Sequence, residues 1–141
     1  SSQVGNVSKF NNFDLICPTE RESRIALATR DEGVEWVANT LMRKTNSRNL
    51  VMKLGGEGFI AYETEPDGFI SRQHFPALSI NPVDVSGAGD SLLAALSVGL
   101  CSGSTLMQSS AIGAGMASLA VQQVGNKLVS NQQLKNYLNK I

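Results

Sequence analysis

The sequence predicts an α/β fold, in which helices are layered on a mostly parallel sheet. Two observations point to it. Short apolar runs typical of buried strands alternate with amphipathic stretches of helical period. A glycine-containing segment at residues 86–89 opens a long apolar run typical of a helix. With 141 residues and 42% hydrophobic content, the chain is long enough for one globular domain.

The N-terminal part contains a strand followed by a capped helix. Residues 13–17 form a short apolar run that ends at Pro18, as a buried strand followed by a turn does. Thr19 and Glu22 have the spacing of a capping box, in which each side chain binds the other residue's backbone N–H. A helix is therefore predicted to begin directly after Thr19.

A second helix is predicted to open at Asp31. Apolar residues recur with helical period from Val34 to Met42 and indicate one buried face, which is a packing role rather than a binding site. Trp36 lies off that stripe. We expect it to be partly exposed or to meet a part of the protein outside this sequence.

A glycine-rich turn follows the next strand. Residues 50–54 form a buried-type strand, and Gly55, Gly56 and Gly58 come directly after it. Ligands in open α/β sheets bind where strands end, so this turn is a candidate binding site. A tight turn explains the glycines equally well, and both interpretations stay open on this segment alone.

A β-hairpin is predicted from two strand-like runs, residues 58–62 and 69–75. They flank a strong turn sequence at residues 65–68. His74, the only histidine, lies on the second run. Because neither a second histidine nor a nucleophile is paired with it, we expect a surface or interface role rather than catalysis.

Two more helices are predicted in the C-terminal part. Ser104, after the helix-breaking Gly103, is positioned to cap a helix over residues 105–124, with Gly125 as its stop. The small residues of this helix suit close approach of either a neighbouring helix or a flat ligand. Ser130 and Gln133 form a capping box for a last helix, which we expect to dock on the sheet. Its apolar stripe consists of Leu134, Tyr137, Leu138 and Ile141.

The most informative segment is Asp-Val-Ser-Gly-Ala-Gly-Asp at residues 84–90, directly before the apolar run. Gly87, Ala88 and Gly89 let the backbone approach a ligand closely, and the first N–H groups of a helix have no intrahelical partner. Because the peptide dipoles add about half a positive charge, this helix start favours an anion such as phosphate. Asp90 in the first turn is either a general base for an acceptor hydroxyl or a residue that only charges the helix start.

Spacing excludes three other glycine motifs. A dinucleotide-binding fingerprint needs a third glycine where Leu92 lies, and a Walker loop needs a Gly-Lys pair followed by Ser or Thr, which the sequence lacks. A nucleophile elbow needs a glycine two residues before Ser86, where Asp84 lies.

Charge and hydropathy exclude further partner classes. Twelve basic and twelve acidic residues cancel without a basic cluster, so we expect neither nucleic acid nor an anionic membrane as a partner. No apolar run reaches the roughly 18 residues that cross a bilayer, and the N-terminus lacks the profile of a secretory signal, so a cytoplasmic location is expected. Cys17 and Cys101 lack metal-ligand spacing and are expected to be reduced thiols.

Residues 84–90 resemble the D-x-x-G-A-G-D motif of the ribokinase-like (PfkB) carbohydrate kinases. The resemblance covers nearly the whole chain and implies a three-layer ribokinase-like sandwich, of which residues 1–141 correspond to the ATP-binding C-terminal part. In the family the sugar-binding half and the lid precede these motifs, so we expect the sequence to be incomplete and inactive by itself. Within the family, the sequence is most similar to the heptose 7-phosphate kinase domain of ADP-heptose synthases.

The resemblance implies a role for each matching residue. Asp90 corresponds to the catalytic base, and the amides from Gly87 through Ala88 and Gly89 to Asp90 correspond to the anion hole for the transferring phosphate. Residues 18–22 match the P-N-x-x-E element, in which Glu22 acts near Mg²⁺ while Thr19 replaces the usual Asn. The other implied ATP-binding residues are Lys53, Gly55, Gly56, Gly58 and Ala114. Some members hold a monovalent cation such as K⁺, and the matching positions are Asp84, Ser86, Ala120 and Gly125.

The sequence therefore predicts a kinase that uses ATP and Mg²⁺ to phosphorylate a hydroxyl of a sugar or sugar phosphate. Two other classes stay open. One is a nucleotide-binding module without turnover, and the other is a structural α/β domain whose exposed sheet edge pairs with another copy. A homodimer also stays open. The acceptor sugar is not specified, because the family's acceptor-contacting residues precede these motifs.

Overall fold

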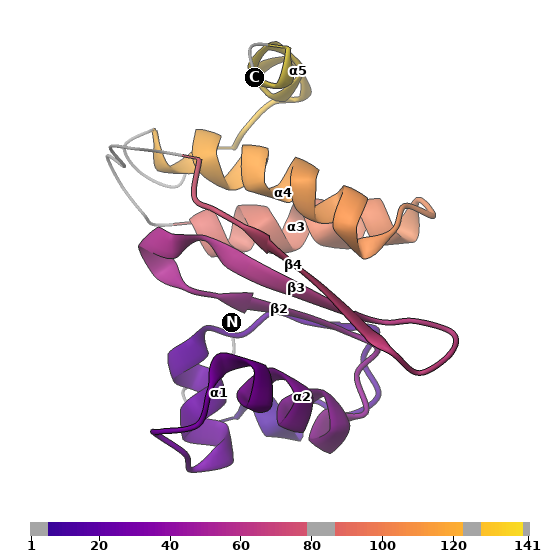
Figure 1. Ribbon diagram of the computed structural model, residues 1–141. Coiled ribbons are helices and arrows are strands. Elements are labelled where there is room, and N and C mark those ends of the chain that lie inside the picture. Colours follow the sequence, from indigo (N-terminus) through magenta and orange to yellow (C-terminus); the bar gives the residue numbers. More distant parts are fainter. Residues whose placement is uncertain (1–5, 79–86, 123–127, 140–141) are drawn as a thin grey trace. The chain divides into compact units, whose positions relative to one another are not determined.

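The computed structural model describes residues 6–78, 87–122 and 128–139, which divide into two compact units, residues 1–74 and 75–141. The first unit contains nearly all of the sheet and two helices, and the second contains three helices (Figure 1). In chain order the elements, with η for a 3-10 helix, are η1 (Val7–Lys9), β1 (Leu15–Ile16), α1 (Glu20–Leu27), α2 (Val34–Thr45), β2 (Asn49–Lys53), η2 (Gly55–Glu57), β3 (Phe59–Thr64), β4 (Ile70–Phe75), α3 (Ala88–Cys101), α4 (Leu106–Val121) and α5 (Asn131–Leu138).

The described strands form one sheet in the order β1-β2-β3-β4. β1 pairs with β2 in parallel, with Ile16 opposite Leu50, whereas β2 pairs with β3 antiparallel, with Val51 opposite Ala61. The α/β class is confirmed, but these four strands form a mixed sheet rather than a mostly parallel one. The reason is that short turns rather than helical crossovers connect β2 to β3 and, in the predicted hairpin, β3 to β4.

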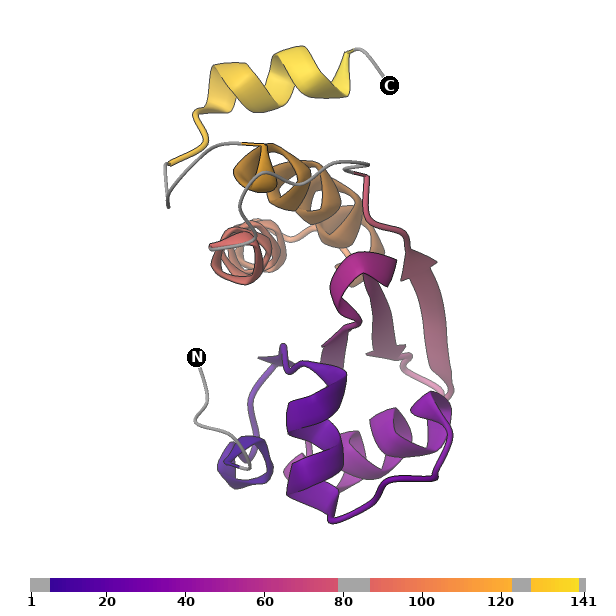
Figure 2. The same ribbon diagram turned by 90° about the vertical axis from the view of Figure 1, so that its left-hand side faces the viewer.

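The core of the first unit lies between the sheet and α1 and α2, which lie side by side on one face of it (Figures 1 and 2). The predicted stripe of α2 is buried, with Val37 and Leu41 fully inaccessible to solvent. They pack with Leu50 of β2 and Tyr62 of β3 in one apolar cluster. Trp36 lies off this stripe and is 43% exposed, as expected.

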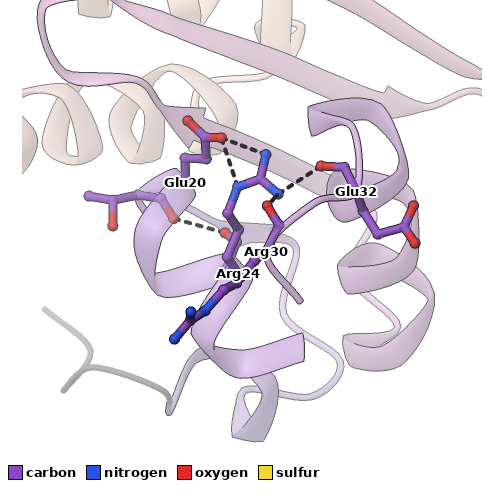
Figure 3. A network of polar contacts seen from close by, with 6 residues as sticks. Glu20, Arg24, Arg30 and Glu32 are labelled. Atoms are coloured by element: carbon purple, nitrogen blue, oxygen red, sulfur yellow. Dashed lines mark hydrogen bonds and ion pairs between the residues drawn. The ribbon is translucent and has the colours of Figure 1, made fainter. Parts of the chain in front are cut away.

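Arg24 fixes the loop that joins α1 to α2 (Figure 3). Its Nε and Nη2 atoms contact Glu20 Oε1 one turn earlier, at 2.8 and 2.7 Å. Its Nη1 atom donates to the carbonyl oxygens of Arg30 at 3.1 Å and Glu32 at 2.7 Å. One guanidinium group therefore holds both α1 and the loop that leads into α2.

In the second unit, α3 and α4 pack antiparallel at very short range. A Cβ atom on Gly99 would lie 2.3 Å from Ser109 Oγ, and one on Gly113 would lie 2.7 Å from Leu92 Cδ1. Because real Cβ atoms do not approach other atoms so closely, only glycine fits at these two positions without displacing a neighbour. Helix packing thus explains part of the small-residue composition of α4.

The apolar stripe of α5, which was expected to dock on the sheet, packs on α4. Its stripe residues Leu134 and Leu138 would each lie 3.5 Å from a Cβ atom on Gly115, and the hydroxyls of Ser118 and Tyr137 lie 3.0 Å apart. An apolar stripe specifies that a face is buried but not what buries it, and Gly115 leaves room for α5 on α4. Ile141, the last predicted member of the stripe, lies outside the described residues.

Two helix starts also differ from the prediction. α2 begins after Gly33 rather than at Asp31, and α4 is capped by Thr105 rather than Ser104. Thr105 forms a complete capping box with Gln108, whereas Ser104 has no residue of that kind at the required spacing. None of the helices that the structure describes is long and apolar enough to cross a membrane.

Candidate functional site

The first part of the candidate site is the glycine turn after β2. Gly55 has a φ of +64°, and Gly58 has a φ of +90° with a ψ of −130°, a conformation that side chains disfavour. Leu54 N–H donates to the Gly58 carbonyl at 2.8 Å and closes the turn. Gly56 has open space where a Cβ would lie, so neither crowding nor positive φ requires glycine there.

His74 supports this turn from the end of β4. Its Nε2 atom lies 2.8 Å from the carbonyl oxygen of Glu57, and because a carbonyl only accepts hydrogen bonds, Nε2 carries the proton. The expected surface position is confirmed, since His74 is exposed. Its bond to the turn was missed, because the pairing of distant segments leaves no local signal in the sequence.

Thr19 and Lys53 lie side by side at the carboxyl ends of β1 and β2. They form an isolated parallel bridge, in which Lys53 N–H donates to the Pro18 carbonyl at 2.9 Å. The parallel pairing of β1 with β2 therefore brings the predicted capping segment next to the strand that leads into the glycine turn. This is the edge at which open α/β sheets bind ligands.

The capping box fixes the carboxylate of Glu22. Thr19 donates to Glu22 Oε2 twice, from its backbone N–H at 2.7 Å and from its hydroxyl at 2.9 Å, and accepts from Glu22 N–H at 3.1 Å. The predicted capping box is confirmed. It occupies the Thr19 hydroxyl, so the residue that replaces the family's Asn orients Glu22.

We expect Thr19→Ala to lower the free energy of unfolding by about 1 kcal/mol, because α1 loses its N-cap acceptor. Thr19→Asn should be close to wild type, since Asn is at least as good an N-cap. Urea denaturation followed by circular dichroism measures both variants. An equal loss in Thr19→Ala and Thr19→Asn would show that capping is not what this side chain contributes.

Cys17 lies near enough to Lys53 and Glu22 for both charges to act on its thiol, and it was not among the residues predicted for the site. Burial raises the pKa of its thiol from 9.0 to about 11; the charge of Lys53 opposes this shift and the carboxylate of Glu22 adds to it. Both groups thus act on the same sulfur. The one signal in the sequence is the position of Cys17 directly before the Pro18–Thr19 segment.

Cys17 should react slowly with thiol reagents at pH 7–8, whereas the exposed Cys101 should be modified quickly. Because folding raises the pKa of Cys17, the folded protein holds the thiol proton more tightly than the unfolded chain does. The protonated thiol therefore favours the folded state. This contribution is complete below about pH 9 and is lost as the pH rises through about 11. Mass spectrometry after timed iodoacetamide labelling would detect the difference, and equal labelling of both cysteines at pH 7.5 would contradict it.

The second part of the candidate site is the start of α3. Gly87 is its N-cap, with a left-handed φ of +77°, and accepts the first helical hydrogen bond from Ser91 N–H at 2.8 Å. The N–H groups of Ala88, Gly89 and Asp90 therefore have no intrahelical acceptor. Gly87 to Gly89 are partly exposed and Asp90 is exposed, so the helix start is open to a ligand on this unit.

The remaining predicted residues fall into two groups. Ala114 and Ala120 lie on α4 and are buried, at 9% and 5% exposure. Asp84, Ser86 and Gly125 lie outside the described residues. Among the residues that the structure does describe, no three His, Cys, Asp or Glu side chains gather as metal ligands. The glycine turn with Thr19, Glu22 and Lys53 lies in the first unit, and the start of α3 lies in the second.

Two features of the first unit suit the phosphates of a nucleotide and their metal ion. Lys53 supplies a positive charge beside a turn whose Gly55 and Gly56 leave open space, and Glu22 is an oriented carboxylate suited to a hydrated divalent cation. A family model of the pfkB family carbohydrate kinases matches residues 7–133.

The chain belongs to the pfkB family of carbohydrate kinases. This confirms the resemblance that rested on residues 84–90. Among curated pfkB-family relatives, the bifunctional protein HldE of Pelobacter propionicus is 26% identical over 132 residues, which are 92% of this chain and 26% of that protein. The protein of the same name from Azorhizobium caulinodans is 44% identical over 62 residues, 44% of this chain and 13% of that protein. The chain thus spans about a quarter of the length of the HldE relatives that it matches over 130 residues or more.

Solved structures show the same fold. The ribokinase of Thermotoga maritima matches with a TM-score of 0.79 at 23% identity, over 92% of this chain and 43% of that one. Phosphofructokinase-2 of Escherichia coli matches with a TM-score of 0.80 at 19% identity, over 96% and 43%. The pfkB-family chain therefore has a ribokinase-like fold over nearly all of its length.

Proposed function

We propose that residues 1–141 are the ATP-binding C-terminal part of a carbohydrate kinase, which transfers the γ-phosphate of ATP to a hydroxyl of a sugar or sugar phosphate. The observation that carries the proposal is the start of α3, where a left-handed Gly87 is followed by N–H groups without an acceptor inside the helix and by an exposed Asp90. Membership of the pfkB family supports it.

At this helix start, the N–H groups of Ala88, Gly89 and Asp90 would donate to the oxygens of the transferring phosphate, where negative charge increases. Asp90 would accept the proton of the acceptor hydroxyl while the oxygen of that hydroxyl forms a bond to the γ-phosphorus. The bond from that phosphorus to the β-phosphate oxygen breaks, and ADP leaves. The carboxylate of Asp90 is better suited to accept this proton than to bind the phosphate, because its negative charge repels the phosphate.

The strand-end residues would bind the rest of the nucleotide. The phosphates would lie along Lys53 and the turn at Gly55, Gly56 and Gly58. Glu22, oriented by Thr19, would act near the metal. Ala114 would lie near the adenine. Mg²⁺, when bound, neutralises phosphate charge. Asp84, Ser86, Ala120 and Gly125 remain the proposed positions for a monovalent cation.

Heptose 7-phosphate is the first acceptor that we propose. The sequence is similar to the heptose 7-phosphate kinase domain of ADP-heptose synthases, and its curated relatives include several proteins named HldE. The acceptor is the finer part of the proposal and needs its own test.

The decisive experiment measures ATP-dependent ADP release by the full-length protein against a panel of sugars and sugar phosphates. Turnover with a sugar or sugar phosphate supports the kinase, and preference for heptose 7-phosphate supports the finer proposal. In parallel, calorimetric titration with a non-hydrolysable ATP analogue measures nucleotide binding. Binding without turnover on any acceptor would overturn the kinase, and failure of both would favour the structural interaction domain.

A nucleotide-binding module without turnover is the second candidate. The observation that favours it is the engagement of the Thr19 hydroxyl with Glu22, which leaves this position less able to contact a nucleotide than the usual Asn.

A further inference from the structure

A hollow lies in the first unit, between α2 and the β3–β4 hairpin. Its volume is about 440 Å³, within the usual range of small-molecule sites. We call it the hairpin hollow. Its lining includes Glu35, Asn39 and Arg43 of α2 and Tyr62, Phe69 and Arg72 of the hairpin.

Tyr62 lines the hairpin hollow and has a buried hydroxyl without a hydrogen-bond partner within the described residues. The residue is 1% exposed. A buried hydroxyl without a partner costs free energy, so such groups are usually satisfied by a ligand or water. Burial also raises the pKa of Tyr62 to about 12, which keeps the hydroxyl protonated and able to donate at neutral pH.

Arg43 brings an unbalanced positive charge. Its Nε donates to the Asn39 carbonyl at 3.3 Å, while its two terminal nitrogens have no hydrogen bond or ion pair within the described residues. The other two charges of the hairpin hollow, Arg72 and Glu35, form an ion pair with each other. The lining therefore carries one positive charge that no acidic residue of the hollow balances. The planar guanidinium of Arg43 offers two donor nitrogens, a geometry that matches a carboxylate or phosphate.

Phe69 adds an apolar surface at the same place. Its side chain is 67% exposed, and its backbone N–H donates to Asp67 Oδ1 at 3.0 Å, which fixes the turn that presents it.

We propose that the hairpin hollow binds a small organic anion with an aromatic body. Its carboxylate or phosphate accepts from the Tyr62 hydroxyl and pairs with Arg43, while its ring packs on Phe69. This site uses none of the residues proposed for ATP binding or phosphoryl transfer.

The test is a titration of the protein with phenyl phosphate, followed by NMR chemical shifts. We expect saturable binding that Tyr62→Phe and Arg43→Gln each weaken about tenfold, whereas Arg48→Gln, an exposed arginine outside the hollow, leaves it unchanged. Benzyl alcohol, which has the ring without the charge, should bind much more weakly. A non-hydrolysable ATP analogue should not displace phenyl phosphate.

Folding and binding are separable in this design. Tyr62→Phe removes only a hydroxyl without a partner, so its urea midpoint should equal or exceed that of the wild type. Undetectable binding of phenyl phosphate, unchanged affinity in Tyr62→Phe or Arg43→Gln, or equal affinity for benzyl alcohol would overturn the proposal. Displacement by the ATP analogue would also overturn it, because phenyl phosphate would then occupy the nucleotide site, whose own proposal would be supported.

Discussion

Asp90→Asn is expected to lower the kcat of the full-length kinase by about 10²–10⁴-fold, the usual contribution of a general base. The amide has nearly the shape of the carboxylate but does not take up the hydroxyl proton. Nucleotide affinity should be largely kept, because the N–H groups at the start of α3 remain. Steady-state kinetics with the acceptor found in the panel, together with calorimetric titration of an ATP analogue, measures both effects.

Asp31→Asn is the matched control, because it makes the same chemical change at an exposed position outside the candidate site. It should leave kcat unchanged. Asp90 is exposed at the start of α3, so Asp90→Asn should also keep the circular dichroism of the wild type. Unchanged turnover in Asp90→Asn would remove this residue from the mechanism and leave it the simpler role of charging a helix start.

Gly99→Ala should lower the free energy of unfolding by about 2 kcal/mol. The added methyl group would lie 2.3 Å from Ser109 Oγ and 2.8 Å from Ser109 Cβ, with the backbone Cα at 3.3 Å, so α3 and α4 must move apart. Ser109 is fully buried, and its hydroxyl donates to the Thr105 carbonyl at 2.9 Å, which limits its freedom to rotate away. Overpacking costs ~1–3 kcal/mol or more, and the better helix propensity of Ala offsets only ~1 kcal/mol of it.

Gly56→Ala serves as the control for this stability measurement, since its Cβ meets nothing within 4 Å. Urea denaturation followed by helical circular dichroism should place it close to wild type. Adding Ser109→Gly to Gly99→Ala removes the clashing atoms, so the two changes should be coupled in a double-mutant cycle. Equal stability of Gly99→Ala and Gly56→Ala would contradict the close packing of α3 on α4.

Local signals predicted helix starts well when the side chains that make the cap were within four residues of each other. The boxes at Thr19 and Ser130 are confirmed in full. Asp31 led to a wrong start for α2. An acidic residue interacts favourably with the helix dipole from several positions near the N-terminus, so it does not mark one start. The N-cap of α2 is Gly33, which makes no side-chain hydrogen bond. Ser104 and Thr105 are adjacent hydroxyls, and only the Gln108 spacing distinguishes them.

The same limit applies to the candidate site, where residues close in sequence were predicted together and contacts between distant segments were not. Gly87 to Asp90 are neighbours in sequence, so their place at one helix start followed from local pattern. The proximity of Thr19 to Lys53 depends on parallel strand pairing, which no local pattern specifies. The contact of His74 with the glycine turn and the environment of Cys17 were missed for the same reason.

α4 has two neighbours that constrain its length as well as its composition. Gly113 faces α3 and Gly115 faces α5, only two positions further along the same helix. One extra residue between them would rotate everything downstream by about 100° and turn the α5 contact away while the α3 contact stayed in place. Insertions and deletions during the evolution of this chain should therefore be tolerated in the exposed turn at residues 65–68 and rejected in the middle of α4.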